Sequence, residues 1–251
     1  EVITEPLTLD EAVDLYYKMC KVIKSIGSTS MKTGMHVNMS IRGTNVKDVN
    51  VAKLLVLLDP KLIKKTFELR EHVEDVYSFL EKNALDFLTG LVKGGIILNT
   101  FEGYIELNQK YRQINFRNMD AGDYSRIEFR FFGGKGYEKR QDVVIEKLYE
   151  TAHALGASLD PDYLDKEYKS RVLRFINKLF DKEMKILVDN MIAETIDFLM
   201  ENNVSPDVFR KSKLGKLYTD ISNGRKRLDF VEFRTLYKRY FKELLVAMRG
   251  R

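Results

Sequence analysis

Two short segments of the chain, within residues 34–42 and 124–134, alternate polar and apolar residues one by one. Successive side chains of a β-strand point to opposite faces, so this period of two predicts two half-buried strands, each with a polar face. The polar residues are His36, Asn38 and Ser40 in the first strand and Arg126, Glu128 and Arg130 in the second.

In most of the remaining chain, apolar residues recur at helical spacing. The first predicted helix is capped within residues 8–10 and runs to about Ile26, with apolar residues at Ala12, Leu15, Met19, Val22 and Ile26. Further helices are predicted within residues 46–58, 61–67, 73–92, 137–155, 163–180, 182–201, 206–221 and 230–248. Since no strand pattern follows Pro161, we expect a mixed domain at residues 1–158 and a helical region at residues 159–251.

The composition is that of a soluble globular protein, with 44% apolar and 31% charged residues. No stretch approaches the roughly 20 apolar residues that span a membrane, and no signal peptide is visible. The only cysteine, Cys20, excludes an internal disulfide and fits a reducing compartment, so a cytoplasmic protein is expected. The chain opens on Glu1 rather than Met, which leads us to expect further sequence upstream.

Positive charge is concentrated near the C-terminus. Residues 205–251 hold 13 Lys and Arg against 5 Asp and Glu, although the whole chain carries a net charge of only +5. Such a segment can contact nucleic acid, an acidic protein or a membrane surface. The interleaved Phe, Leu and Tyr at helical spacing favour the simpler interpretation of a solvated helical face, and binding of nucleic acid stays an open alternative.

The Arg-x-Glu-x-Arg pattern of residues 126–130 sets a carboxylate between two guanidinium groups on one strand face. Guanidinium groups bind carboxylates and phosphates with two hydrogen bonds, and a carboxylate beside an imidazole suits Mg²⁺ or Mn²⁺. A covered face of this kind needs partners for its charges. An exposed, ion-paired strand would show the same pattern, so spacing alone leaves both alternatives open.

The identities of the residues add a resemblance. Residues 34–41 resemble the Gly-Met-His-x-His-x-Ser-Leu strand of glutamine synthetases, and residues 126–131 resemble the Arg-Ile-Glu-x-Arg strand of the same superfamily. Residues 127–134 are most similar to the amidoligase version of that strand. Residues 111–115 and 1–6 are similar to two further amidoligase segments. Together the four segments, in the family's order, make residues 1–156 resemble the amidoligase family of glutamine-synthetase-like carboxylate–amine ligases.

The resemblance implies an α+β fold: a curved antiparallel sheet of the glutamine-synthetase catalytic type with flanking helices, followed by the all-helical C-terminal region. The family's first strand, which carries a Glu-x-Glu-like pair of metal ligands, is expected upstream of Glu1. The oligomeric state stays open, with a homo-oligomer as one expectation because relatives assemble.

The resemblance also assigns roles to single residues. Metal ligands would be His36, Glu128 and, by a looser match, Glu1. Arg126 would hold the transferred phosphate and Arg130 the carboxylate substrate. Residues implied near the nucleotide or in its pocket are Asn38, Ser40, Asn115 and Arg112.

The implied activity is a ligation that depends on ATP and on Mg²⁺ or Mn²⁺. It joins a carboxylate substrate to an amine through an acyl phosphate, and peptide-like carboxylates are among the expected substrates. One departure is Asn38, where many relatives have a second His. The alternatives are a catalytically inactive member of the fold, acting as a structural or assembly protein that binds a protein or nucleic acid through its basic tail, and a kinase-like relative.

Overall fold

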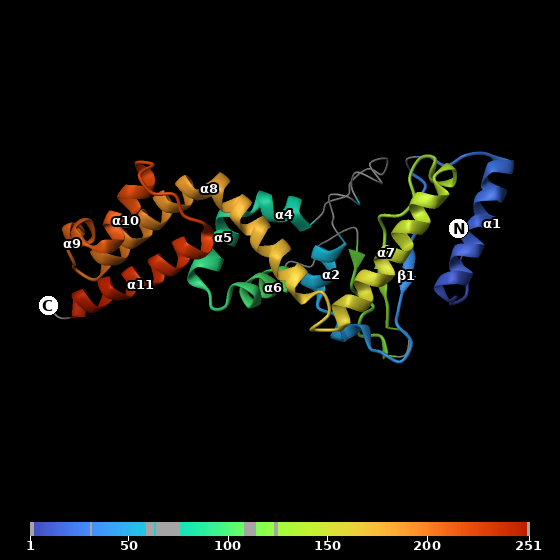
Figure 1. The fold of residues 1–251 in the computed structure, drawn as a ribbon, viewed down its shortest axis with the longest axis horizontal. Coiled ribbons are helices and arrows are strands. Elements are labelled where there is room, and N and C mark those ends of the chain that lie inside the picture. The colour runs from blue at the N-terminus through green and yellow to red at the C-terminus, as the bar shows by residue number, and fades with distance from the viewer. Residues whose placement is uncertain are drawn as a thin grey trace. The chain divides into compact units, whose positions relative to one another are not determined.

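The computed structural model describes residues 3–30, 32–58, 63, 76–107, 114–122 and 125–249 (Figure 1). The chain forms two compact units. Unit 1 consists of Glu1–Phe79 and Ile105–Tyr168, and unit 2 of Leu80–Tyr104 and Lys169–Arg251. The internal segment Leu80–Tyr104 thus groups with the C-terminal helices, while the predicted domain boundary between residues 158 and 159 stays a prediction.

Unit 1 contains a small antiparallel sheet of three short strands: β1 (Val37–Met39), β2 (Ile114–Asn115) and β3 (Ile127–Phe129). Their order is β1-β3-β2, so β3 is central. Ile127 and Phe129 have no solvent exposure, whereas Glu128 between them is half-buried. The predicted alternation of β3 is therefore confirmed, with its apolar face directed into the core of the unit.

The helices of unit 1 are α1 (Leu9–Ile26), α2 (Val51–Leu57) and α7 (Gln141–Leu159), together with the single 3₁₀ turns η1 (Val46–Asp48) and η3 (Tyr137–Lys139). Helix α1 begins with a capping box, because Thr8 accepts from the Glu11 amide while the Glu11 carboxylate accepts from Thr8. It packs on η3 and α7, and α2 packs on α7. These contacts enclose Val13, Tyr16 and Cys20.

The described residues of unit 2 form helices joined by turns and loops, and no strand. Its helices are α5 (Ala84–Lys93), α9 (Pro206–Lys211), α10 (Lys213–Ser222), α11 (Phe230–Arg249) and most of α8 (Asp165–Glu201). Helix α8 crosses the unit boundary, as do α4 (Val76–Lys82) and α6 (Ile97–Leu107). Helix α11 packs on α5 and α10. Phe180 of α8 meets Phe230 and Phe233 of α11 in the core, with ring centroids 5.6 and 5.2 Å away.

An arginine attaches α11 to the end of α5. The Nε of Arg234 donates to the Leu91 carbonyl at 2.8 Å, and its terminal nitrogen donates to the Gly94 carbonyl at 2.9 Å. The last carbonyls of a helix have no partner within the helix, so an arginine from a neighbouring helix satisfies them.

The predicted fold class is wrong. The described residues are 69% helical, and the sheet that they form is a small three-stranded antiparallel one rather than the curved sheet of glutamine synthetases with flanking helices. The two alternating patterns are real, but β1 and β3 span only three residues each. The chain leaves β1 for a turn at Gly43, with a φ of 77°, and leaves β3 for the turn at Gly133 and Gly134. Helical patterns fill most of the remaining sequence.

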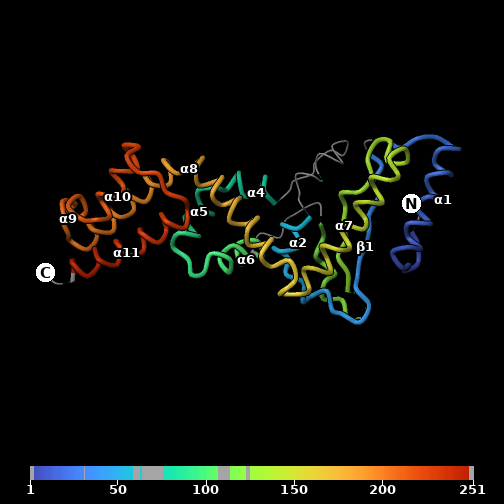
Figure 2. The backbone as a smooth tube through the Cα atoms, in the orientation of Figure 1, coloured from blue at the N-terminus to red at the C-terminus, as the bar shows by residue number. Residues whose placement is uncertain are grey.

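Several helix predictions are confirmed, with two instructive differences. The predicted helices at 163–180 and 182–201 are one continuous helix, α8 (Figure 2), because no Gly or Pro interrupts Asp165–Glu201. In α1 the apolar residues Val22 and Ile26 are 56% and 81% exposed, since the contacts with η3 and α7 involve another face of the helix. Residues 61–62, 64–67 and 73–75 of the predicted helices lie outside the described residues.

Within the part of the chain that the structure describes, no helix combines the length and the apolar character needed to cross a membrane.

Candidate active site

Three polar residues form a row across the sheet of unit 1. In the antiparallel register Asn38 of β1 lies opposite Glu128 of β3, which in turn lies opposite Asn115 of β2. Residues paired in this way share one face of a sheet. The apolar neighbours Ile127 and Phe129 occupy the other face, so the alternation that forms the strand also selects its polar side.

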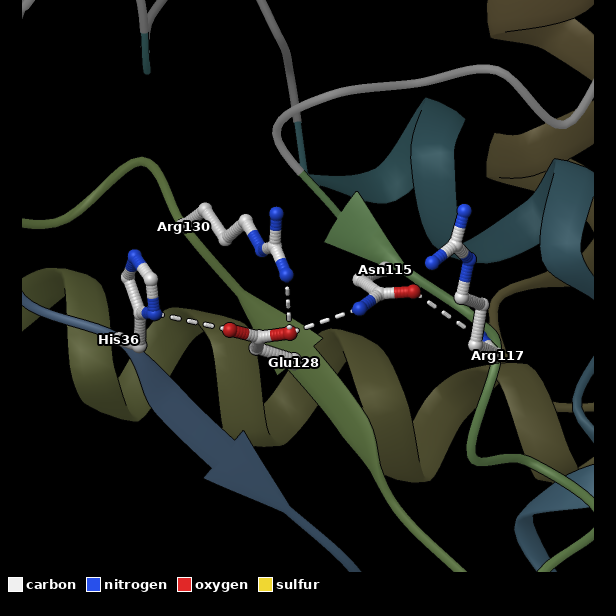
Figure 3. A network of polar contacts seen from close by, with 5 residues as sticks. All are labelled: His36, Asn115, Arg117, Glu128 and Arg130. Atoms are coloured by element: carbon white, nitrogen blue, oxygen red, sulfur yellow. Dashed lines mark hydrogen bonds and ion pairs between the residues drawn. The ribbon is translucent and has the colours of Figure 1, made fainter. Parts of the chain in front are cut away.

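Glu128 is the centre of a polar network on this face (Figure 3). One carboxylate oxygen, Oε1, lies 2.9 Å from the Nδ1 of His36. The other, Oε2, accepts from a terminal nitrogen of Arg130 at 2.8 Å and from the Nδ2 of Asn115 at 2.8 Å. Side-chain exposure is 13% for Glu128, compared with 48% for His36 and 41% for Arg130. A sheltered carboxylate is thus bound by Asn115 and by two more exposed side chains, those of His36 and Arg130.

These contacts keep Glu128 ionised. Partial burial raises its pKa, but the hydrogen bonds from Arg130 and Asn115 and the nearby charges of Arg130 and His36 lower it more, so the pKa lies below its ordinary value. A carboxylate with this environment is negative at neutral pH. The network therefore joins an anion to a guanidinium group and to an imidazole that is charged only when protonated.

Asn115 connects the network to the end of β2. Its Oδ1 accepts from the backbone amide of Arg117 at 3.1 Å while its Nδ2 donates to Glu128. The two contacts fix which way the amide points, because oxygen can only accept and nitrogen can only donate. Figure 3 shows the guanidinium groups of Arg117 and Arg130 with the Asn115 amide between them. The sequence prediction missed Arg117, although the alternation Asn115, buried Phe116 and exposed Arg117 continues the polar face.

The turn that follows β3 is tightly packed against the segment before β1. Gly133 has a φ of 103°, and a Cβ atom added there would lie 2.7 Å from the Met35 backbone nitrogen. Beside this turn the buried Nε of Arg130 has no hydrogen-bond acceptor among the described residues. An unpaired buried donor costs free energy, so Arg130 keeps capacity for one more acceptor such as a carboxylate or phosphate oxygen.

A second carboxylate, Glu138, holds the same turn. Thr29 donates to Glu138 Oε2, and the Thr29 hydroxyl oxygen accepts from the Gly136 amide at 2.7 Å. Glu138 has no solvent exposure; burial raises its pKa, but the Thr29 hydrogen bond and the charge of Lys139 help to lower it overall. No residue pattern had indicated this contact, because Thr29 and Glu138 are 109 positions apart. We assign Glu138 a positioning role for the turn after Arg130.

The structure brings together four of the predicted site residues: His36, Asn115, Glu128 and Arg130. Asn38 and Ser40 are exposed, and Asn38 lies opposite Glu128 in the register. Arg126 is half-buried, and its backbone amide donates to the Asn118 carbonyl at 2.9 Å. The last two predicted site residues, Glu1 and Arg112, lie outside the described residues.

The donors of the network are of the kind that binds a divalent cation. Within the described ranges, no group of three or more His, Cys, Asp and Glu side chains is arranged to hold a metal ion. Mg²⁺ in nucleotide sites is commonly bound by one or two carboxylates, with phosphate oxygens and waters at the other positions. The Glu128 carboxylate and the His36 imidazole, 2.9 Å apart, fit such a metal as its protein ligands.

Comparisons with models of protein families, with curated proteins and with solved structures found no match to this chain.

Proposed function

We propose that the chain is an ATP- and Mg²⁺-dependent carboxylate–amine ligase, related to the amidoligases. The observation that carries the proposal is the Glu128 network, in which His36, Asn115 and Arg130 contact one carboxylate. The same residues are those that the resemblance assigns to metal, nucleotide and carboxylate binding. His36 is about 80 or more positions before the other three residues in the chain, so the convergence of all four on one sheet face supports a shared site.

The proposed reaction has two steps. A carboxylate oxygen of the substrate attacks the terminal phosphorus of ATP, which forms an acyl phosphate and releases ADP. The amine nitrogen then attacks the acyl carbon, the carbon–oxygen bond to phosphate breaks, and the amine loses a proton. Both steps require positioning and neutralisation of phosphate charge rather than a protein nucleophile.

Each polar side chain has a proposed task in this reaction. Glu128 and His36 would hold the metal, which would supply positive charge to the phosphates when bound. Arg130 would bind the substrate carboxylate, and its buried Nε without an acceptor supports this assignment. Arg126 would hold the transferred phosphate. Asn38, Ser40 and Asn115 would line the nucleotide side.

The contacts of Glu128 also say what has to change on binding. Both of its oxygens already have protein partners, so metal binding would replace the contact between Oε1 and His36. Arg130 and Asn115 can stay in place, because both bind the other oxygen, Oε2. The proposal therefore predicts that His36 and Glu128 would lose their direct contact when both hold the metal, while the contact of Glu128 with Arg130 would stay intact.

The same contacts favour a second candidate function. Both oxygens of the Glu128 carboxylate are bound by neighbouring side chains, and His36, Asn38 and Ser40 on the same face are exposed. An ion-paired structural surface without a catalytic role would have the same arrangement. In that case the chain is a non-catalytic structural or assembly protein. This candidate shares the network but not the binding of ATP.

Turnover experiments separate the two candidates. We expect the full chain with ATP and Mg²⁺ to release phosphate when a panel of carboxylates and amines is supplied, and mass spectrometry to identify the amide product. Glu128→Gln and Arg130→Ala should each abolish turnover while the circular dichroism spectrum is retained. Glu194→Gln, which removes the exposed Lys93–Glu194 pair of unit 2, is the matched control and should keep full activity. Absence of ATP and Mg²⁺ binding would refute the ligase.

A further inference from the structure

Unit 2 carries a group of basic residues at the end of α9, on α10 and in the turn after α10. We call Lys211, Lys216, Arg225, Lys226 and Arg227 the basic strip. Between residues 210 and 227 the only acidic residue is Asp220. The strip is thus the most one-sided part of the basic C-terminal region.

The fold directs these side chains outward. Leu214, Leu217, Tyr218 and Ile221 are the buried side of α10, and they leave Lys216 on the exposed side. Of the strip residues, Lys226 is half-buried and the others are exposed. The charges of Lys211, Lys216, Arg225 and Arg227 are therefore exposed to solvent within one short stretch of the chain.

Neighbouring basic residues have acidic partners, whereas the strip does not. Arg210 pairs with Asp207 at 3.2 Å and Lys213 with Glu243 at 3.0 Å. For the five strip residues, no carboxylate in the described parts of the chain lies within ion-pair distance. Unpaired like charges repel one another, so an external anion would gain the full attraction of the strip.

The three basic residues after α10 are held in place by the backbone. The Asp220 carbonyl accepts from the amides of Arg225 at 2.8 Å and Lys226 at 3.2 Å, and Gly224 turns the chain with a φ of 67°. This turn keeps Arg225, Lys226 and Arg227 at the C-terminal end of α10. The ten residues of α10 extend about 15 Å, so Lys211 before this helix and Arg225 after it are separated by about its length, with Lys216 between them.

We propose that the basic strip binds nucleic acid through its phosphate backbone, without reading sequence. Exposed Lys and Arg without acidic partners, spread over the length of α10, can contact several phosphates of a duplex or single strand at once. Insertion into a membrane surface as an amphipathic helix would need apolar side chains beside the charges. The large exposed apolar residues described between residues 205 and 248 are only Val231 and Val246, both on α11. The proposal does not depend on the ligase function.

The test uses the full chain and a fluorescein-labelled DNA duplex of about 20 base pairs, with fluorescence anisotropy at about 50 to 200 mM KCl. The strip variant is Lys216→Gln/Arg225→Gln/Arg227→Gln. The matched control is Lys18→Gln/Lys21→Gln/Lys24→Gln, which also removes three positive charges, but from exposed positions on α1. Each phosphate contact contributes about 0.9 to the slope of log affinity against log salt concentration.

We expect the strip variant to bind DNA at least about tenfold more weakly and to lose about two to three units of that slope. The control should change the affinity by less than about twofold. Equal losses in both variants would show that only net charge matters, and undetectable DNA binding by the parent chain would also overturn the proposal. Strip-dependent binding to phosphatidylserine vesicles without DNA binding would assign the surface to a membrane instead.

Discussion

The sheet face of unit 1 and the basic strip of unit 2 both display basic side chains. The charges of the sheet face are paired with one another, whereas those of the basic strip are not. Around Glu128 the charged groups satisfy one another, with contacts of 2.8 to 2.9 Å on a carboxylate that is 13% exposed. The basic strip, in contrast, has no acidic partner among the described residues, and four of its five residues are exposed to solvent. Residue type alone therefore does not distinguish the Glu128 network from the basic strip. The two differ in whether each charge has a partner of opposite sign and in how far it is buried.

The largest effect on stability is expected from Glu128→Gln. The change removes the negative charge on which Arg130 and His36 converge, in a sheltered position, and should lower the free energy of unfolding by about 1–3 kcal/mol. Glu243→Gln, which breaks the exposed Lys213 pair of unit 2, should cost less than about 1 kcal/mol. Urea denaturation of both variants makes the comparison. Equal costs would mean that the sheet network is an ordinary surface ion pair.

Acid should weaken the contribution of Glu128. Its folded-state pKa lies below the ordinary value of 4.5, so its stabilising contribution is present above that pH and is lost as the pH falls through the lowered pKa. The stability difference between the parent chain and Glu128→Gln should therefore shrink from pH 6 towards pH 3. A difference that stays constant across this range would contradict a lowered pKa.

Asn115→Asp tests the Asn115 contact separately. The new carboxylate keeps an oxygen that accepts from the Arg117 amide, but the nitrogen that donates to Glu128 is replaced by a second oxygen, which cannot donate when the carboxylate is ionised. We expect the pKa of Glu128 to rise relative to the parent chain, since a like charge disfavours ionisation. NMR titration of the Glu128 carboxyl carbon measures this. Asn38→Asp adds the same charge opposite Glu128 without removing the Asn115 donor, so it should raise the Glu128 pKa less. An unchanged Glu128 pKa in Asn115→Asp would show that the amide contact is absent in solution.

The smallest stability effect belongs to the basic strip. Neutralising Lys216, Arg225 and Arg227 removes no ion pair and relieves repulsion, so the free energy of unfolding should stay within about 0.5 kcal/mol of the parent value. Thermal denaturation at low salt is the measurement. A substantial loss of stability would show that the strip side chains have a structural task in unit 2.

The contrast also explains what the sequence could predict. Period-two alternation identified β1 and β3 and placed Glu128 and Arg130 on one face, because strand geometry is local. The Thr8 cap of α1 was readable for the same reason. The Thr29–Glu138 contact depends on residues far apart in the chain, and no local pattern encodes it. The extent of the sheet was overestimated, because alternation indicates a strand without showing how long its partner stays extended.

The proposed ligase site is tested most directly by NMR of His36 during titration with Mn²⁺ and ATP. The chain has three histidines, and His153 on α7, which contacts Tyr163 at 3.2 Å, serves as an internal reference. If His36 and Glu128 hold a nucleotide-bound metal, paramagnetic Mn²⁺ should broaden the His36 ring signals strongly in the parent chain and far less in Glu128→Gln, while His153 stays sharp. Sharp His36 signals at saturating Mn²⁺ and ATP would contradict the proposed site.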